Sequence, residues 1–178
     1  MAILETDRLV LRPLAHEDLD WFSALRGDPD VMQYIGSQRP LTREQSVEKL
    51  DKYLKCWTEN GLGMFGIRWG DDPVGWGGLQ PLENTGEIEV GYAFGKKSWG
   101  LGLATETARA VVAWGFREKQ LDRVVAVASP ENSASRHVMD KLGMTYEGLK
   151  FRYGNDCAYY SLTRADFAAN EAKRGGAK

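Results

Sequence analysis

A glycine-rich segment of this chain has the residue types of an anion-binding turn. It reads Lys97-Ser98-Trp99-Gly100-Leu101-Gly102-Leu103-Ala104-Thr105 and lies between a strand-like apolar run at 88–94 and a helical run that ends near residue 116. A glycine turn before a helix leaves backbone N–H groups unpaired, and the helix dipole adds partial positive charge there. Because glycine has no Cβ, a phosphate oxygen can approach this backbone closely. We therefore predict a phosphate or pyrophosphate site formed by the backbone of 98–104, with the Thr105 hydroxyl as a further donor.

The common nucleotide-binding loops fit this chain poorly. The stretch Gly91-Tyr92-Ala93-Phe94-Gly95-Lys96-Lys97 is one residue short of a P-loop and has lysine where Ser or Thr belongs. The dinucleotide pattern lacks its third glycine after Gly100-Leu101-Gly102, because Thr105 occupies that place. A literal G-x-G-x-x-G at 61–66 follows a helix-like run and precedes a strand-like one, which is the wrong context for a dinucleotide loop. These departures disfavour a nucleotide kinase.

Several ordered motifs resemble those of one known family. With Lys97 in the basic first position, the segment resembles the [Gln/Arg]-x-x-Gly-x-[Gly/Ala] loop with which GNAT acyltransferases hold the pyrophosphate of acetyl-CoA. The stretch 132–144 resembles the family's Asn-x-x-Ser…Leu-Gly-Met segment. The opening, Glu5-Thr6-Asp7-Arg8-Leu9-Val10-Leu11-Arg12-Pro13-Leu14, is similar to the branch that contains the ribosomal-protein N-terminal acetyltransferases. The resemblance covers about residues 4 to 167 and does not specify a substrate.

The resemblance also assigns residues to the donor site. It implies that backbone groups of Tyr92, Ala93 and Phe94 bind the pantetheine arm, and that Asn132 bonds CoA, although Asn is also a good helix cap. It places Ser135 near the CoA sulfur as thiolate stabiliser or general acid, where the alternative is an exposed helix serine. Many relatives use a tyrosine acid about four residues later, where this chain has Met139. Tyr146 and Tyr153 are substitutes in principle.

The general base is expected on the strand that meets the donor. Glu87 and Glu89 share one face of that strand by its period of two. Glu89 is the first candidate because relatives place a glutamate before Val90-Gly91-Tyr92, and a solvated strand face is the alternative. The ribosomal-protein branch has a further glutamate in its penultimate strand, but this chain has Tyr153-Gly154 there, with Asp156 nearby. That departure disfavours a ribosomal-protein acceptor. Tyr34 and Trp76 are the residues expected in the acceptor pocket.

Composition excludes several other classes of protein. At 178 residues, with 43% hydrophobic and 27% charged residues, the chain predicts one ordinary globular domain. The net charge of −2 favours no nucleic-acid partner, and no apolar run approaches a membrane span, so no membrane partner is expected. No secretory signal pattern is visible, which predicts a cytoplasmic protein. Cys56 and Cys157, with His16 and His137, have no metal-ligand spacing, so no metal is expected.

The apolar patterns predict a mixed sheet with helices. Thr42 and Gln45 form a capping box that opens a helix at 42–59, and a shorter helix is expected at 17–26. The remaining expected elements are strands at 64–69, 74–79, 87–94, 123–128, 145–153 and 157–164, and helices at 104–119 and 133–142. This order gives an α/β (α+β) fold with a mostly antiparallel central sheet, which the resemblance specifies as GNAT-like, with about 6–7 strands, about 4 helices and a splayed central strand pair. A single domain at 1–167 and a frayed tail at 168–178 are expected.

The residues and the resemblance together predict an acetyl-CoA-dependent N-acetyltransferase. It would transfer the acetyl group directly to an amine, which is a protein N-terminus or a small-molecule amine such as an amino acid, a polyamine or a drug. The alternative is a non-catalytic module on the same fold that binds acyl-CoA or senses an amine. A homodimer is compatible with the resemblance. The identity of the acceptor does not follow from the sequence.

Overall fold

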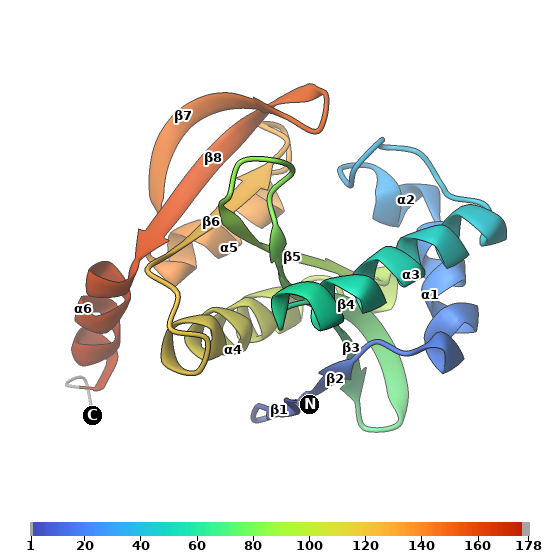
Figure 1. The fold of residues 1–178 in the computed structure, drawn as a ribbon, viewed down its shortest axis with the longest axis horizontal. Helices are drawn as coiled ribbons and strands as arrows, with labels where there is room; N and C mark the ends of the chain where they lie inside the picture. Colours follow the sequence, from blue (N-terminus) through green and yellow to red (C-terminus); the bar gives the residue numbers. More distant parts are fainter. Residues whose placement is uncertain (1, 176–178) are drawn as a thin grey trace.

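A computed structural model describes residues 2–175 of the chain. One sheet of eight strands runs through these residues (Figure 1). The strands are β1 (Leu4–Glu5), β2 (Val10–Pro13), β3 (Met64–Trp69), β4 (Asp72–Pro81), β5 (Ile88–Phe94), β6 (Arg123–Ala128), β7 (Thr145–Arg152) and β8 (Asn155–Thr163). The helices are α1 (Leu19–Arg26), α2 (Pro29–Met32), α3 (Arg43–Asn60), α4 (Leu103–Arg117), α5 (Ser133–Leu142) and α6 (Arg164–Gly175), with short 3-10 turns η1 (His16–Asp18) and η2 (Lys96–Ser98).

The sheet is antiparallel except at its centre. Its strand order is β1-β2-β3-β4-β5-β6-β8-β7, and β5 and β6 are its parallel pair. These two strands pair in register only at Glu89 and Val125, so they separate beyond that point. Figure 1 shows the opening between β5 and β6. The predicted mixed fold and its splayed central pair are therefore confirmed, with more strands and helices than the sequence suggested.

The two larger apolar cores lie on opposite faces of the sheet. Consecutive residues of β3 divide between them: Phe65 belongs to the core under α4, and Met64 belongs to the core under α1 and α3. This division follows from the period of two in a strand, because neighbouring side chains point to opposite faces. Trp76 is 2% exposed and lies in the second core with Phe22, at a ring-centroid distance of 5.2 Å. Within residues 2–175, no helix has the length and apolarity needed to cross a membrane.

Local signals fixed several helix ends as expected. Thr42 and Gln45 form the predicted capping box at the start of α3, and Gly61 ends that helix in the left-handed conformation. Residues 168–175, which the sequence predicted as tail, belong to helix α6. The aromatic ring of Phe167 stacks on Phe116 at 4.8 Å, and this contact holds α6 against α4. Residues 176–178 lie outside the described residues.

Candidate active site

A cleft opens where β5 and β6 separate. One part, of about 220 Å³, lies between the segment at 34–38 and the β7–β8 turn, and a second part, of about 430 Å³, extends to the start of α4. The two parts adjoin, because Tyr34, Tyr92, Asn132 and Ser135 line both of them. A ligand lying along the cleft would therefore contact the glycine-rich turn at one end and the β7–β8 turn at the other.

The glycine-rich turn has the geometry of an anion cradle. Gly100 and Gly102 adopt left-handed φ angles of 73° and 78°, and a Cβ at Gly100 would meet no atom within 4 Å. Gly102 is the N-cap of α4 and offers no side chain to its first turn. The N–H groups of that turn are therefore available to a ligand, and Ala104 and Thr105 line the cleft there. These features fit the pyrophosphate of a CoA-type molecule.

Most of the predicted cradle residues border the cleft. Those that do so are Ser98, Trp99, Gly100, Gly102, Leu103, Ala104 and Thr105. Lys97 and Leu101 lie outside its lining. Lys96 is engaged elsewhere, because its Nζ lies 2.7 Å from an Asp30 carboxylate oxygen. Lys97, by contrast, makes no ion pair among the described residues, and its role at the pyrophosphate stays a prediction.

The N-terminal segment at 5–14 holds the glycine-rich turn in place. Glu106, in the first turn of α4, accepts a hydrogen bond from Thr6 Oγ1 at 2.6 Å and pairs with the Arg8 guanidinium at 2.6 Å. Desolvation opposes ionisation of Glu106, but the hydrogen bonds from Thr6 and Arg8 hold its pKa below the usual value. Arg8 also donates to the Leu101 carbonyl at 2.9 Å. Two sequence motifs about a hundred residues apart thus meet to shape the cradle.

At the middle of the cleft, two hydroxyl groups lie together. The Tyr92 Oη and Ser135 Oγ atoms are 3.0 Å apart. Burial raises the pKa of Tyr92 to about 12, against a hydrogen bond with Ser135 that lowers it, so its phenol is neutral near pH 7. Asn132 acts as N-cap of α5, where its side chain accepts from the Ser135 N–H at 3.0 Å. The sequence predicted a backbone role for Tyr92, and the structure adds its side chain.

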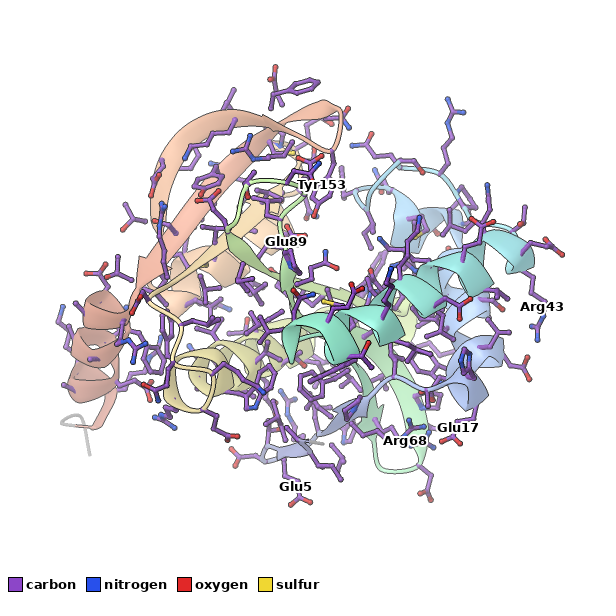
Figure 2. The ribbon with its side chains drawn as sticks, in the orientation of Figure 1. Glu5, Glu17, Arg43, Arg68, Glu89 and Tyr153 are labelled. Carbon is purple, nitrogen blue, oxygen red and sulfur yellow. The ribbon has the colours of Figure 1, made fainter. Side chains whose placement is uncertain are left out.

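At the other part of the cleft, Glu89 is a buried carboxylate with two partners. It is 4% exposed, and its Oε1 accepts hydrogen bonds from Gln80 Nε2 at 2.5 Å and from the Tyr153 hydroxyl. No described residue hydrogen-bonds to Oε2. Burial raises the Glu89 pKa, and the hydrogen bonds from Tyr153 and Gln80 oppose this shift. Figure 2 shows Glu89 and Tyr153 in the same region, between β5 and the β7–β8 turn.

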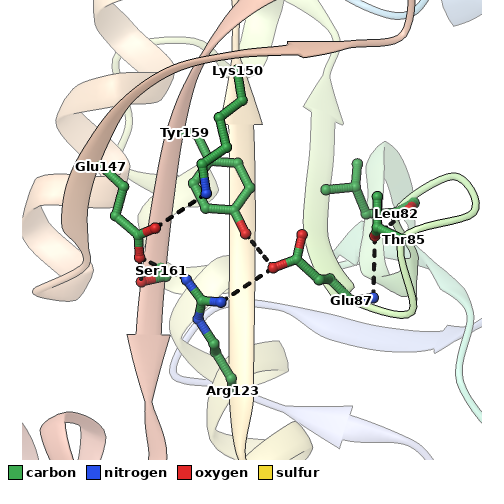
Figure 3. Close-up of polar contacts among 8 residues, drawn as sticks. All are labelled: Leu82, Thr85, Glu87, Arg123, Glu147, Lys150, Tyr159 and Ser161. Atoms are coloured by element: carbon green, nitrogen blue, oxygen red, sulfur yellow. Dashed lines mark hydrogen bonds and ion pairs between the residues drawn. The ribbon is translucent and has the colours of Figure 1, made fainter.

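Glu87, the second candidate base, lies in a different environment. Its Oε1 accepts a hydrogen bond from the Tyr159 hydroxyl and pairs with Arg123 at 3.2 Å (Figure 3). Arg123 joins it to Glu147, which also binds Lys150 at 3.2 Å. None of these five residues lines the cleft. The structure therefore separates the two glutamates that the sequence placed on one strand face, because β5 begins only at Ile88 and Glu87 precedes it.

Both predicted acceptor-pocket residues border the cleft. Tyr34 and Trp76 line the part that contains Glu89. The structure adds Arg26, Lys49 and Tyr53 to this part, none of which the sequence analysis singled out. Arg26 ends an amphipathic helix where a basic residue is ordinary, so no local signal marked it.

The residues considered as substitutes for a tyrosine acid, and Cys157, differ in whether they line the cleft. Met139 lines the cleft where relatives are expected to carry a tyrosine acid. Tyr146 packs on Tyr160 at 5.2 Å and does not line the cleft, whereas Tyr153 does. Cys157 lines the same part of the cleft, and burial raises the pKa of its thiol, which disfavours a reactive thiolate.

Comparisons with known proteins agree with this geometry. Residues 8–145 match the acetyltransferase (GNAT) domain family. The chain belongs to the GNAT acetyltransferases. It is 30% identical over 175 residues to an uncharacterized N-acetyltransferase of Bacillus subtilis, YoaA, across 91% of this chain and 97% of that protein. It is 35% identical over 153 residues to FsC-acetyl coenzyme A-N(2)-transacetylase of Aspergillus fumigatus, across 80% of this chain and 65% of that protein.

A solved structure of the same family confirms the fold. The crystal structure of a GNAT-family acetyltransferase from Bacillus anthracis superposes with a TM-score of 0.79 at 26% identity, over 92% of this chain and 99% of that one. As a GNAT acetyltransferase, the protein is an acyltransferase, and acetyl-CoA is the donor used by the family. The uncapped glycine turn of α4 is the part of this acetyltransferase that fits the donor's pyrophosphate.

Proposed function

We propose that this acetyltransferase transfers the acetyl group of acetyl-CoA directly to the nitrogen of an amine. The observation that carries the proposal is the continuity of the cleft. It joins the anion cradle of α4 to the buried carboxylate of Glu89, with the Tyr92–Ser135 pair between them. The Aspergillus relative is named for acetyl coenzyme A and an N(2) position, which agrees with this chemistry.

The reaction needs an acceptor amine that has lost its proton. Glu89 serves as the base that removes this proton, since burial raises its pKa toward the range in which a carboxylate accepts a proton effectively. The hydrogen bonds from Gln80 and Tyr153 to Oε1 fix the carboxylate and leave Oε2 to face the acceptor. The neutral amine attacks the thioester carbonyl carbon, so that a C–N bond forms and the C–S bond breaks.

The sulfur leaves with the electron pair of the broken C–S bond. Ser135 donates a proton to it, and the neutral Tyr92 phenol, 3.0 Å from the Ser135 hydroxyl, resupplies Ser135. As the C–S bond breaks, the attacking nitrogen gives up its second proton to solvent, and solvent returns a proton to Tyr92, so the amide and both hydroxyls end neutral. Holding donor and acceptor in one cleft supplies most of the rate acceleration, because it replaces a collision of two molecules by a positioned reaction. The cleft residues Asn132, Tyr34 and Trp76 are proposed to orient the two substrates.

A non-catalytic sensor of acyl-CoA or an amine is the alternative on the same fold. The test is calorimetric titration with acetyl-CoA, followed by a panel of amines with measurement of released CoA. Binding with CoA release for one class of acceptor supports transfer. Binding without release for peptide N-termini, amino acids, polyamines and amine drugs would instead support the sensor.

Association of two copies is a further part of the proposal. The edge strand β7 exposes Leu149 and Phe151, whose exposed fractions are 58% and 65%. An edge strand with exposed apolar side chains offers both backbone groups and apolar surface to another chain. Sedimentation should give a dimer that dissociates in Phe151→Glu. A monomer at every concentration would contradict this part of the proposal.

A further inference from the structure

The cleft contains a buried arginine without a counter-ion. Arg26, the last residue of α1, is 2% exposed and lines the part of the cleft that contains Glu89. Its Nη2 donates to Tyr53 Oη at 2.7 Å, and its Nε has no hydrogen-bond partner. Within residues 2–175, no carboxylate forms an ion pair with this guanidinium. A buried charge is normally paired, so this arginine lacks an expected partner.

Aromatic rings hold the guanidinium in place but do not neutralise it. Its central carbon lies 4.6 Å from the ring centroid of Trp76, 5.0 Å from that of Phe22 and 5.5 Å from that of Tyr53. Such cation–π contacts are strongest when desolvated, and they offset part of the cost of burial. A planar guanidinium with unused N–H donors matches the two oxygens of a carboxylate.

A second cation lines the same part of the cleft. The Nζ of Lys49, on α3, lies 4.9 Å from the ring centroid of Tyr53. The hydroxyl of the same tyrosine accepts the hydrogen bond from Arg26. The acidic residues of this part, Glu89 and Asp156, come instead from β5 and β8. The cleft therefore has two cations from α1 and α3 and a base from the sheet.

We propose that the acceptor is a small amine that also carries a carboxylate, and that Arg26 and Lys49 bind this carboxylate while the amine faces Glu89. The inference rests on the proposed acetyl transfer to an amine and narrows its acceptor class. An amino acid has both groups. A polyamine would bring further positive charge against Arg26 and Lys49, and like charges in a desolvated site disfavour binding.

The test compares amino acids with their primary amides as acceptors. The two differ at the carboxylate, and the amide keeps more of its amine neutral, so a preference for the acid has to come from recognition of the carboxylate. The wild-type protein should favour the best acid over its amide by about tenfold or more in kcat/KM. Equal values for the acid and its amide would overturn the inference while leaving acetyl transfer intact.

Arg26→Met tests the residue itself. It should bring the acid-to-amide ratio near one, mainly through a higher KM for the acid. Arg43→Met is the matched control, since Arg43 is exposed on α3 and lies outside the cleft lining, and its ratio should stay at the wild-type value. If circular dichroism shows that Arg26→Met does not fold, Arg26→Lys and Lys49→Met take its place, and each should lower the ratio. An unchanged ratio in the folded variants contradicts the inference.

A binding measurement separates this inference from the proposed reaction. If no amine releases CoA, the proposed reaction fails, and CoA-saturated protein is then titrated with the same acids and amides. Binding of acids alone, lost in Arg26→Met or Arg26→Lys, would uphold the carboxylate site. Absence of acid binding would reject it.

Discussion

The hydroxyl groups of Tyr92 and Ser135 lie 3.0 Å apart in the middle of the cleft. They come from β5 and α5, and both residues line the two parts of the cleft. Each of the two hydroxyls is within hydrogen-bond distance of the other, so a proton lost from one can be replaced from the other.

This pair should act as a unit in turnover. We expect Ser135→Ala to lower kcat by about 10²-fold or more, because the leaving sulfur loses its proton donor, while acetyl-CoA still binds. Tyr92→Phe should lower kcat less, and the double variant should be no slower than Ser135→Ala, because both changes interrupt one path. Steady-state kinetics with calorimetry measures both effects. Additive losses would show that the two hydroxyls act independently.

Glu89 should govern the acidic limb of the pH profile. Its pKa is raised by burial, so the rate should fall as pH decreases through a value above the ordinary 4.5 of a glutamate. Glu89→Gln should remove this limb and slow turnover by about 10²–10⁴-fold, since no base then takes the amine proton. Glu87→Gln is the matched control on the same segment, and it should keep the profile. An unchanged limb in Glu89→Gln would assign the base elsewhere.

The burial of Glu89, which helps catalysis, should lower the stability of the folded protein. A carboxyl group whose folded pKa is raised costs stability when it ionises, so this cost grows as pH rises above the unfolded value. Glu89→Gln should therefore be more stable than the wild-type protein near pH 8, and the difference should shrink toward pH 4. Thermal unfolding at several pH values measures it. A variant that is less stable at pH 8 would contradict the assigned burial cost.

A negative charge in the cradle should weaken donor binding without harming the helix. Asp at position 104 lies near the N-terminus of α4, where it favours the helix by about 0.3–1 kcal/mol. In the cleft it would repel a pyrophosphate, so Ala104→Asp should raise the Kd for CoA by about tenfold or more. Ala165→Asp, in the first turn of α6, is the matched control outside the cleft. Equal affinity in both variants would place the pyrophosphate elsewhere.

Glu147 should stabilise the fold above its lowered pKa. The Ser161 hydroxyl, Lys150 and Arg123 hold the pKa of this carboxyl at about 2, against some desolvation, compared with a usual 4.5. Because the folded pKa is lowered, its stabilisation is present above about pH 4.5 and is lost as pH falls toward 2. The Tm advantage of the wild-type protein over Glu147→Gln should shrink over that window. Glu48→Gln, at an exposed position of α3, is the control.

Strong local signals made part of the fold predictable. The strands at 64–69 and 123–128 and the helix at 133–142 have the predicted bounds, because apolar periodicity and caps such as Asn132 and Gly143 act within a few residues. Helix α6 was missed, since it is held by contacts such as Phe167 with Phe116, far apart in sequence.

Only part of the candidate site was predictable from sequence motifs. The glycine turn, Asn132 and Ser135 are visible as motifs, and the structure brings them into one cleft. Arg26 and the contact of Tyr153 with Glu89 have no such signal, because each depends on side chains brought together across the sheet.

The most direct test of acetyl transfer is mass spectrometry of the acceptor after incubation with acetyl-CoA. We predict that an amine gains one acetyl group at nitrogen, that an equal amount of CoA is released, and that both are formed more slowly, and by the same factor, in Glu89→Gln. Tight binding of acetyl-CoA with no acetylated product from any class of amine would contradict it.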